Sequence, residues 1–223
     1  MNKKIDKMGN FTNKKRISMF KSITLPFTKL SILALLLTGC TNYENSMKVL
    51  PSELSIADQC RNINKQFEMD CYDLISYKNT FAQLRLGLNA QYRGNFDEAM
   101  TRYKIAKDAG NFYADALIAD MYYHGFGVEK DDDEVTSYLK NTKNVDPISA
   151  YKLFYYYIAK EDVKEALKLL TFAAENNVKN AQLELSIVYA NGEYTPADLE
   201  KSTYWKLQSE DLSNSFTNKI YGL

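Results

Sequence analysis

Apolar side chains recur every three or four residues along most of the chain after residue 50, which is the spacing of one face of an α-helix. Examples run from Ala114 through Ile118 to Tyr122, and from Ala166 through Leu169. Glycine and proline are sparse, at 9 and 4 residues of 223, and clusters of turn-forming residues do not bound strand-like runs. The pattern therefore predicts an all-α fold.

The helical pattern repeats along the chain. A motif with alanine, tyrosine, glycine and aspartate at fixed spacing occurs at Ala114 and again at Ala181, 67 residues later, and a shortened unit lies between the two copies. One helix pair cannot bury its apolar face alone, so such pairs stack on one another. We therefore predict a solenoid of helix pairs over residues 80–210, whose units begin near Ala82, Ala114, Ala150 and Ala181.

The clear copies read Ala114-x-x-x-Ile118-Ala119-x-x-Tyr122-x-x-Gly125-x-Gly127-Val128-x-x-Asp131 and Ala181-x-x-x-Leu185-Ser186-x-x-Tyr189-x-x-Gly192, and residues 165–175 carry the second half of the pattern. These units resemble the Sel-one-like repeat family, a relative of the tetratricopeptide repeats. In the second copy Tyr194 and Thr195 replace the family's second glycine and its valine. The resemblance implies a right-handed α-solenoid of stacked antiparallel helix pairs.

Small residues have two expected roles in these units. Residues such as Gly87 and Ala119 allow two helices to approach closely. Gly125 and Gly127 fall between the helices of one pair, where a positive φ angle is expected.

Two further segments flank the repeats. Residues 52–79 are expected to form an N-terminal capping helix pair, with Ser52 capping its first helix and the second helix beginning at Cys71. Residues 211–223 carry apolar side chains at helical spacing and are expected to form a C-terminal cap.

Residues 1–39 have the order of a signal peptide. A lysine-rich stretch precedes the apolar run Leu30–Leu37, which is too short to span a bilayer and ends in Thr38-Gly39-Cys40. The ending resembles the bacterial lipobox, and the resemblance implies that Cys40 is lipidated and becomes the mature N-terminus. The alternative is a signal anchor with a coincidental cysteine. The true start is either Met1 or Met19.

The lipobox resemblance also implies a location. Thr41 rather than aspartate follows the cysteine, which by the sorting pattern of Gram-negative lipoproteins indicates a lipid anchor in the outer membrane, with the domain expected on the periplasmic face. Residues 40–51 would then be a lipidated tether. Two or more acyl chains hold a protein stably at a membrane.

Cys60 and Cys71 are the cysteines that remain after Cys40 is lipidated. An exported protein meets an oxidising compartment, so we predict a disulfide between them, worth roughly 3 kcal/mol in the chain-entropy description. Two unpaired core cysteines on adjacent helices are the alternative. With His124 as the single histidine, a Cys/His catalytic pair or zinc site has few possible members.

The charge of the chain is unevenly distributed. The chain has 28 basic and 28 acidic residues, but residues 1–39 hold eight of the basic and one of the acidic ones, which leaves 20 basic and 27 acidic from Cys40 onward. An acidic domain without a basic cluster repels phosphate backbones, which argues against a nucleic-acid partner. A basic or mixed protein partner suits this charge better.

The Sel-one-like resemblance implies that the first helix of each pair lines a concave, partner-binding surface. Tyrosines are favoured there because they offer contact area and a hydroxyl at low entropic cost, although tyrosines at helical spacing often serve inter-helix packing instead. By register, the exposed positions of these helices are Gln91, Tyr113, Asp120, Tyr123, His124, Lys152, Tyr156 and Lys160.

Sequence motifs for catalysis or for a bound metal are weak or missing. The acidic run from Asp131 to Glu134 offers carboxylates to a cation, but it also opens a predicted helix, where carboxylates favourably meet the helix dipole. We favour the helix-start interpretation. No G-x-S-x-G, H-E-x-x-H or phosphate-loop pattern occurs, so no cofactor and no catalytic residue are expected.

These observations favour a non-enzymatic adaptor or inhibitor, anchored at a membrane, that binds a protein. By analogy with lipidated relatives, a narrower hypothesis is an immunity protein against a secreted toxin, such as a lipase-type effector of a type VI secretion system. One alternative is a structural or regulatory part of an envelope machine. Another is a β-lactam-processing enzyme, whose serine chemistry needs at least a Ser-x-x-Lys motif; that spacing occurs at Ser137–Lys140 and at Ser149–Lys152.

Overall fold

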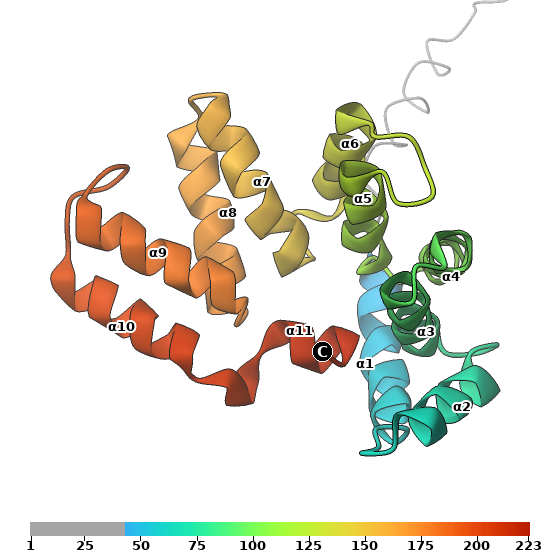
Figure 1. Cartoon of the computed structure of the whole chain (residues 1–223). Helices are drawn as coiled ribbons and strands as arrows, with labels where there is room; N and C mark the ends of the chain where they lie inside the picture. Colours follow the sequence, from blue (N-terminus) through green and yellow to red (C-terminus); the bar gives the residue numbers. More distant parts are fainter. Residues whose placement is uncertain (1–42) are drawn as a thin grey trace, which may run out of the picture. The chain divides into compact units, whose positions relative to one another are not determined.

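A computed structural model describes residues 43–223, which form helices joined by short turns and contain no strand (Figure 1). The signal peptide at 1–39 and the lipidation of Cys40 lie outside the described residues. In chain order the helices are α1 (Glu44–Asp58), α2 (Lys65–Ile75), α3 (Thr80–Tyr92), α4 (Phe96–Asp108), α5 (Ala114–His124), α6 (Asp132–Thr142), α7 (Pro147–Ala159), α8 (Val163–Glu175), α9 (Lys179–Asn191), α10 (Leu199–Glu210), the 3-10 turn η2 (Leu212–Asn214) and α11 (Phe216–Tyr221).

Four successive helix pairs make up most of this part of the chain. Helices α3 and α4, α5 and α6, α7 and α8, and α9 and α10 each pack as a hairpin, and the second helix of one pair contacts the first helix of the next (Figure 1). This arrangement confirms the predicted all-α, right-handed solenoid of stacked antiparallel pairs.

Small residues lie where the helices approach most closely. Gly87 of α3 faces the fully buried ring of Tyr103 in α4, and a methyl group at position 87 would lie 2.5 Å from the Cε1 atom of that ring. Ala114, Ala119 and Ala181 are also fully buried. Close packing therefore depends on the small residues that the repeat pattern places at these points.

The turns within the pairs have the expected glycine geometry. Gly125 and Gly127 adopt φ angles of 73° and 68° after α5, and Gly192 adopts 68° after α9. The carboxylate of Asp131 then caps α6, because its Oδ1 accepts hydrogen bonds from the backbone N–H groups of Asp133 and Glu134, both at 3.0 Å. The acidic run thus begins a helix, as predicted.

The N-terminal region differs from the prediction in its boundaries. Helix α1 begins at Glu44 and continues through Pro51, so most of the expected tether at 40–51 is helical, and Ser52 lies inside the helix rather than capping it. Leu50 and Leu54 are buried, which places both sides of Pro51 on one packed face. Helix α2 likewise begins at Lys65, before Cys71, with Asn64 as its cap.

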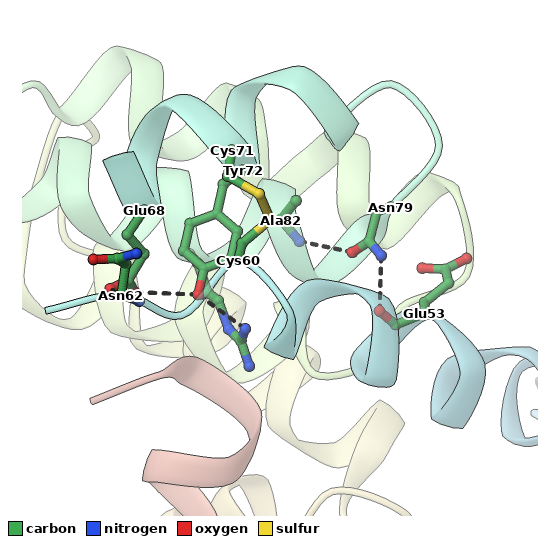
Figure 2. The surroundings of a disulfide bond; sticks show 9 residues. Glu53, Cys60, Asn62, Glu68, Cys71, Tyr72, Asn79 and Ala82 are labelled. Carbon is green, nitrogen blue, oxygen red and sulfur yellow. Dashed lines mark hydrogen bonds between the residues drawn. A yellow bond between two sulfur atoms is a disulfide. The ribbon is translucent and has the colours of Figure 1, made fainter. Parts of the chain in front are cut away.

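The predicted disulfide joins Cys60, just after α1, to Cys71 in α2 (Figure 2). Beside it, the buried Tyr72 hydroxyl donates to Glu68 at 3.1 Å. Asn79 links the start of α3 to α1, because its side chain accepts from the Ala82 N–H at 2.9 Å and donates to the Glu53 carbonyl at 2.7 Å (Figure 2). Covalent and polar contacts therefore hold α1, α2 and α3 together.

The segment 211–223 does not lie where a cap for the last pair was expected. Helix α11 makes its main helix contacts with α3, near the beginning of the solenoid, and no residue of α10 is buried. The apolar spacing correctly indicated a helix at this end of the chain. Its partner surface comes from the other end of the domain.

Two carboxylates are buried near the contact between α5 and α7. Asp146 caps α7 by accepting from the N–H groups of Ile148 and Ser149 at 3.0 and 3.3 Å, and it has no exposed surface. Burial raises the pKa of Asp146 to about 7, and the negative charge of Asp115 adds to this rise. Burial also raises the pKa of Asp115 to about 6, against the lowering effect of Lys107. Both carboxyl groups therefore keep their protons to a higher pH in the folded domain than in the unfolded chain.

We expect Gly87→Ala to lower the free energy of unfolding by about 2 kcal/mol. The added methyl group overpacks the buried Tyr103 ring, and this destabilisation exceeds the stabilisation from the higher helix propensity of alanine. Urea denaturation followed by circular dichroism measures this difference. The exposed Lys104→Ala in α4 serves as the control and is expected to change stability little. A Gly87→Ala domain as stable as the original would show that Tyr103 moves aside freely.

The free energy of unfolding should fall as the pH rises from 5 to 8. Both Asp115 and Asp146 have folded-state pKa values above the unfolded value of 3.8, so their stabilising protonation is lost as the pH rises through about 6 to 7. We expect a decrease of roughly 4 kcal/mol by urea denaturation, because the two pKa values lie about two units and one unit above pH 5 and each unit corresponds to about 1.4 kcal/mol. Asp115→Asn should flatten this dependence and raise stability at pH 8. A pH-independent stability for the original domain would contradict the argument.

Candidate functional site

An open hollow of about 640 Å³ lies where α5, α6 and α7 meet. Four of the residues predicted to bind a partner line it, namely Tyr123, Lys152, Tyr156 and Lys160. Tyr123 stands at the end of α5 and is 59% exposed, whereas Lys152, Tyr156 and Lys160 follow one another at four-residue spacing along α7 and just beyond it. Residues that share a face of one helix are thus brought opposite a tyrosine of the preceding pair.

Lysines surround the ring of Tyr156. The Lys140 ammonium of α6 donates to the Tyr156 hydroxyl at 3.0 Å and lies 4.5 Å from the ring centre, while the Lys160 ammonium lies 5.9 Å from that centre. The hydrogen bond from Lys140 lowers the pKa of the Tyr156 hydroxyl. The hollow therefore presents a phenol with two positive charges close to it.

Asp120 and His124 lie next to the hollow on α5. The carboxylate of Asp120 accepts a hydrogen bond from the Lys152 ammonium at 2.9 Å, which ties α5 to α7. His124 is half exposed, its Nε2 lies 3.7 Å from the same carboxylate, and its ring contacts the rings of Tyr123 and Phe126. Both residues thus belong to the edge of the same surface.

Gln91 and Tyr113 lie in a different part of the fold. The side chain of Gln91 accepts a hydrogen bond from the Tyr103 hydroxyl at 2.7 Å. The ring of Tyr113 packs 5.7 Å from the ring of Phe216, so α11 covers part of it, and burial raises the pKa of its hydroxyl to about 12. Helical register therefore grouped the α7 residues on one face, where Lys160 is exposed and Lys152 and Tyr156 are half-buried, but it missed that α11 packs onto the corresponding face near α3.

Helix α6 supplies residues that the sequence analysis did not select. Lys140 contacts Tyr156 directly, and Asp132 and Asp133 contribute carboxylates to the opposite rim. They were missed because only the first helix of each pair was considered. The signal was available, since an antiparallel hairpin places the start of α6 beside the end of α5, and α6 packs against α7.

The chemistry of the hollow is that of recognition. Two tyrosines provide apolar area with hydroxyls, three lysines provide positive charge, and the rim carries two carboxylates. Within residues 43–223, no group of three or more histidine, cysteine, aspartate or glutamate side chains is arranged to hold a metal ion. The side chains present can therefore bind carboxylates, amides and apolar groups through hydrogen bonds and contact area.

Solved structures with similar folds include two bacterial proteins. A crystal structure of a Sel1 repeat protein from Oxalobacter formigenes matches with a TM-score of 0.59 and 24% identity, over 66% of this chain and 63% of that one. The second is c5321, a protective antigen present in uropathogenic Escherichia coli strains that displays an SLR fold. It matches with a TM-score of 0.54 and 21% identity, over 75% of this chain and 39% of that one.

The comparisons leave the specific activity of the chain open. No family model and no curated protein matches the sequence. The chain spans less than two thirds of the length of each of the two solved structures, and at identities below 25% the match concerns the fold. The helix pairs, the glycine turns and these structural matches show that the described part of the chain has the solenoid fold of Sel1 repeat proteins.

Proposed function

We propose that this chain is a membrane-anchored protein of the bacterial cell envelope that binds a protein partner in the hollow between α5, α6 and α7. The observation that carries the proposal is the exposed Tyr123 and the half-buried Tyr156 beside Lys140 and Lys160. Aromatic side chains with nearby charge are the groups that most often dominate protein interfaces. The hollow also has a size that accommodates several partner side chains.

The charges of the hollow favour a particular kind of partner surface. Lys152 is already paired with Asp120, whereas the Lys140 and Lys160 ammonium groups lie around the Tyr156 ring. A partner that presents a carboxylate beside an apolar group would meet both ammonium groups and the phenol ring. This local preference refines the expectation of a basic or mixed partner, which considered only the net charge of the mature chain.

The proposed anchor is a lipid on Cys40. None of the helices within residues 43–223 has the length and apolar character needed to span a bilayer. Because α1 begins at Glu44, the chain from Cys40 to the first helical residue reaches at most about 14 Å when fully extended. Lipidation of Cys40 would therefore hold the solenoid directly beside the periplasmic side of the outer membrane, and local concentration would favour a partner that acts there.

A narrower form of this proposal is an immunity protein against a lipase-type toxin that enters the periplasm. It rests on the resemblance to lipidated repeat proteins and on the proposed location of the hollow at a membrane. A toxin encoded beside this chain and captured by it would support the narrower form. A deletion strain that survives exposure to sister cells would count against it.

Cys40→Ala should move the protein from the membrane fraction to the soluble periplasmic fraction, because the acylated sulfur is the proposed attachment point. Fractionation followed by immunoblotting measures the change, and mass spectrometry of the original protein should detect the acyl groups. A Thr41→Ala variant is the control and should remain with the membrane. Membrane association of Cys40→Ala would overturn the lipid anchor without affecting the binding proposal.

Tyr123→Ala and Tyr156→Ala should each lower partner affinity about tenfold, because truncating a central interface tyrosine removes buried contact area. Affinity capture from envelope extracts identifies the partner, and titration with the purified partner gives the dissociation constant. Tyr204→Ala on α10 is a matched control, because Tyr204 is 53% exposed and Tyr123 is 59% exposed. Equal affinities for all three variants and the original protein would place the interface elsewhere.

A further inference from the structure

The chain's own helix α11 packs against α3 and lies beside α1 (Figure 1). It occupies a groove lined by α1, by Phe81 of α3 and by Tyr113 at the start of α5. Phe216, Ile220 and Tyr221 are buried there, and Tyr221 is only 4% exposed. The Tyr221 hydroxyl donates to the Tyr113 carbonyl at 3.1 Å, at the beginning of α5. This short helix is therefore bound by the first half of the solenoid in the way that a peptide ligand would be.

Two arginines donate hydrogen bonds to backbone carbonyls of α11. The Arg61 Nη2 atom donates to the Asn218 carbonyl at 2.6 Å, and the Arg85 Nη2 atom donates to the Lys219 carbonyl at 3.2 Å. Asp58 holds both guanidinium groups, at 2.8 Å from Arg61 and 2.6 Å from Arg85. Arg61 also donates to the Asn218 side chain at 3.2 Å, and the Asn218 carbonyl accepts from the Gly222 N–H at 3.0 Å. The arginines therefore recognise the C-terminal end of a helix through its carbonyls and through one polar side chain.

The occupant does not fill its groove. On one side of α11 a hollow of about 470 Å³ remains beside Lys219 and Ile220, and α1 lines it with Met47, Leu50 and Leu54. A second hollow of about 750 Å³ adjoins the groove beside Tyr221, where α2, α3 and the start of α4 line it, and its apolar lining includes Leu88 and Phe96. Each hollow is large enough for several further side chains.

Ordering α11 in its bound conformation also has a large entropic cost for so short a helix. A helix of six residues is not stable by itself in water, so residues 216–221 become ordered through docking. The preceding turn offers little support, because Leu212 is 70% exposed and no residue of η2 is buried. A longer helix would lose less conformational entropy for each contact that it makes, and it would reach both hollows.

We propose that the groove between α1, α3 and α5 is a second protein-binding site, and that α11 is its displaceable resident. The partner it fits is an amphipathic helix longer than α11. This helix ends with its carbonyls on Arg61 and Arg85, and it carries a large apolar side chain where α11 has Lys219. The site is separate from the hollow around Tyr156 and does not depend on the function proposed for that hollow.

The experiment uses the whole chain and a fluorescein-labelled synthetic peptide of residues 211–223. Phe216→Ala with Tyr221→Ala weakens the resident helix, and fluorescence anisotropy then measures binding of the original-sequence peptide. We expect the weakened chain to bind at least tenfold tighter than the original chain, whose tethered α11 competes with the peptide. Equal binding by the two chains, or none by the weakened chain, would overturn the proposal.

Two further changes test how the groove recognises its occupant. Arg61→Ala in the weakened chain should lower peptide affinity at least threefold, whereas Tyr204→Ala on α10 should leave it unchanged. A peptide with Lys219→Met should bind at least threefold tighter than the original peptide, because the added apolar group enters the hollow beside Leu50 and Leu54. A weaker Lys219→Met peptide would show that the groove is already optimally filled.

If the weakened chain does not fold, hydrogen exchange on the original chain tests whether α11 can leave its groove. The amides of residues 218–221 should exchange at least a hundredfold faster than those of α3, which would show that α11 opens without global unfolding. Exchange of α11 and α3 at the same rate would overturn the proposal. So would a stable dimer of the original chain that swaps α11, because the occupant would then be a second copy.

Discussion

The structure depends on the burial of helix faces that no single helix pair can cover. Ala114 and Ala181 are fully buried because the neighbouring pair closes over them, and Gly87 allows α4 to approach α3 closely enough to enclose Tyr103. Each pair is therefore stable only as part of the stack. The same constraint explains why the two ends of the solenoid differ from its middle. A terminal pair has a neighbouring pair on one side alone, so its other apolar face needs a different cover.

The two ends of the solenoid differ in how their terminal helices are covered. At the beginning, the Cys60–Cys71 bridge holds α2 to the end of α1, and α11 adds apolar cover on α3. At the other end α10 has no buried residue, and Leu199 and Leu207 are 74% and 60% exposed. The chain thus places its last helix on the groove of its first half instead of on its last pair. A surface of the first half that would otherwise face water is covered as a result.

Local features of the sequence predicted most of the fold. The repeat spacing located the helix pairs, and Gly125 and Gly127 have the positive φ angles expected between them. The start of α1 was misplaced because Ser52 is a favourable capping residue, whereas here Leu50 and Leu54 pack on either side of Pro51 within one helix. The apolar series of Tyr43, Met47, Leu50 and Leu54 was the available signal for the longer helix.

The candidate surfaces were harder to predict because they depend on contacts between distant residues. Arg61 and Asn218 are separated by 157 positions, and nothing near either residue indicates that they meet. Register along α7 correctly grouped Lys152, Tyr156 and Lys160, but Lys140 joins them only through the packing of α6. Net charge has the same weakness, because an acidic chain still gathers three lysines in one hollow. The sequence pattern identifies which residues share one face of a helix, whereas tertiary packing determines which residues of other helices lie beside that face.

Helix α5 separates the two surfaces and makes their independence physically reasonable. Tyr113 stands just before its first residue and contacts α11, whereas Tyr123 lies near its last residue and lines the hollow with α7. Ten residues of helix correspond to about 15 Å. Ile118 and Ala119, between them, are fully buried, so α5 is fixed along its length by its neighbours. Release of α11 would expose the groove at Tyr113 without requiring Tyr123 to move, and one solenoid can therefore offer two recognition surfaces of different chemistry.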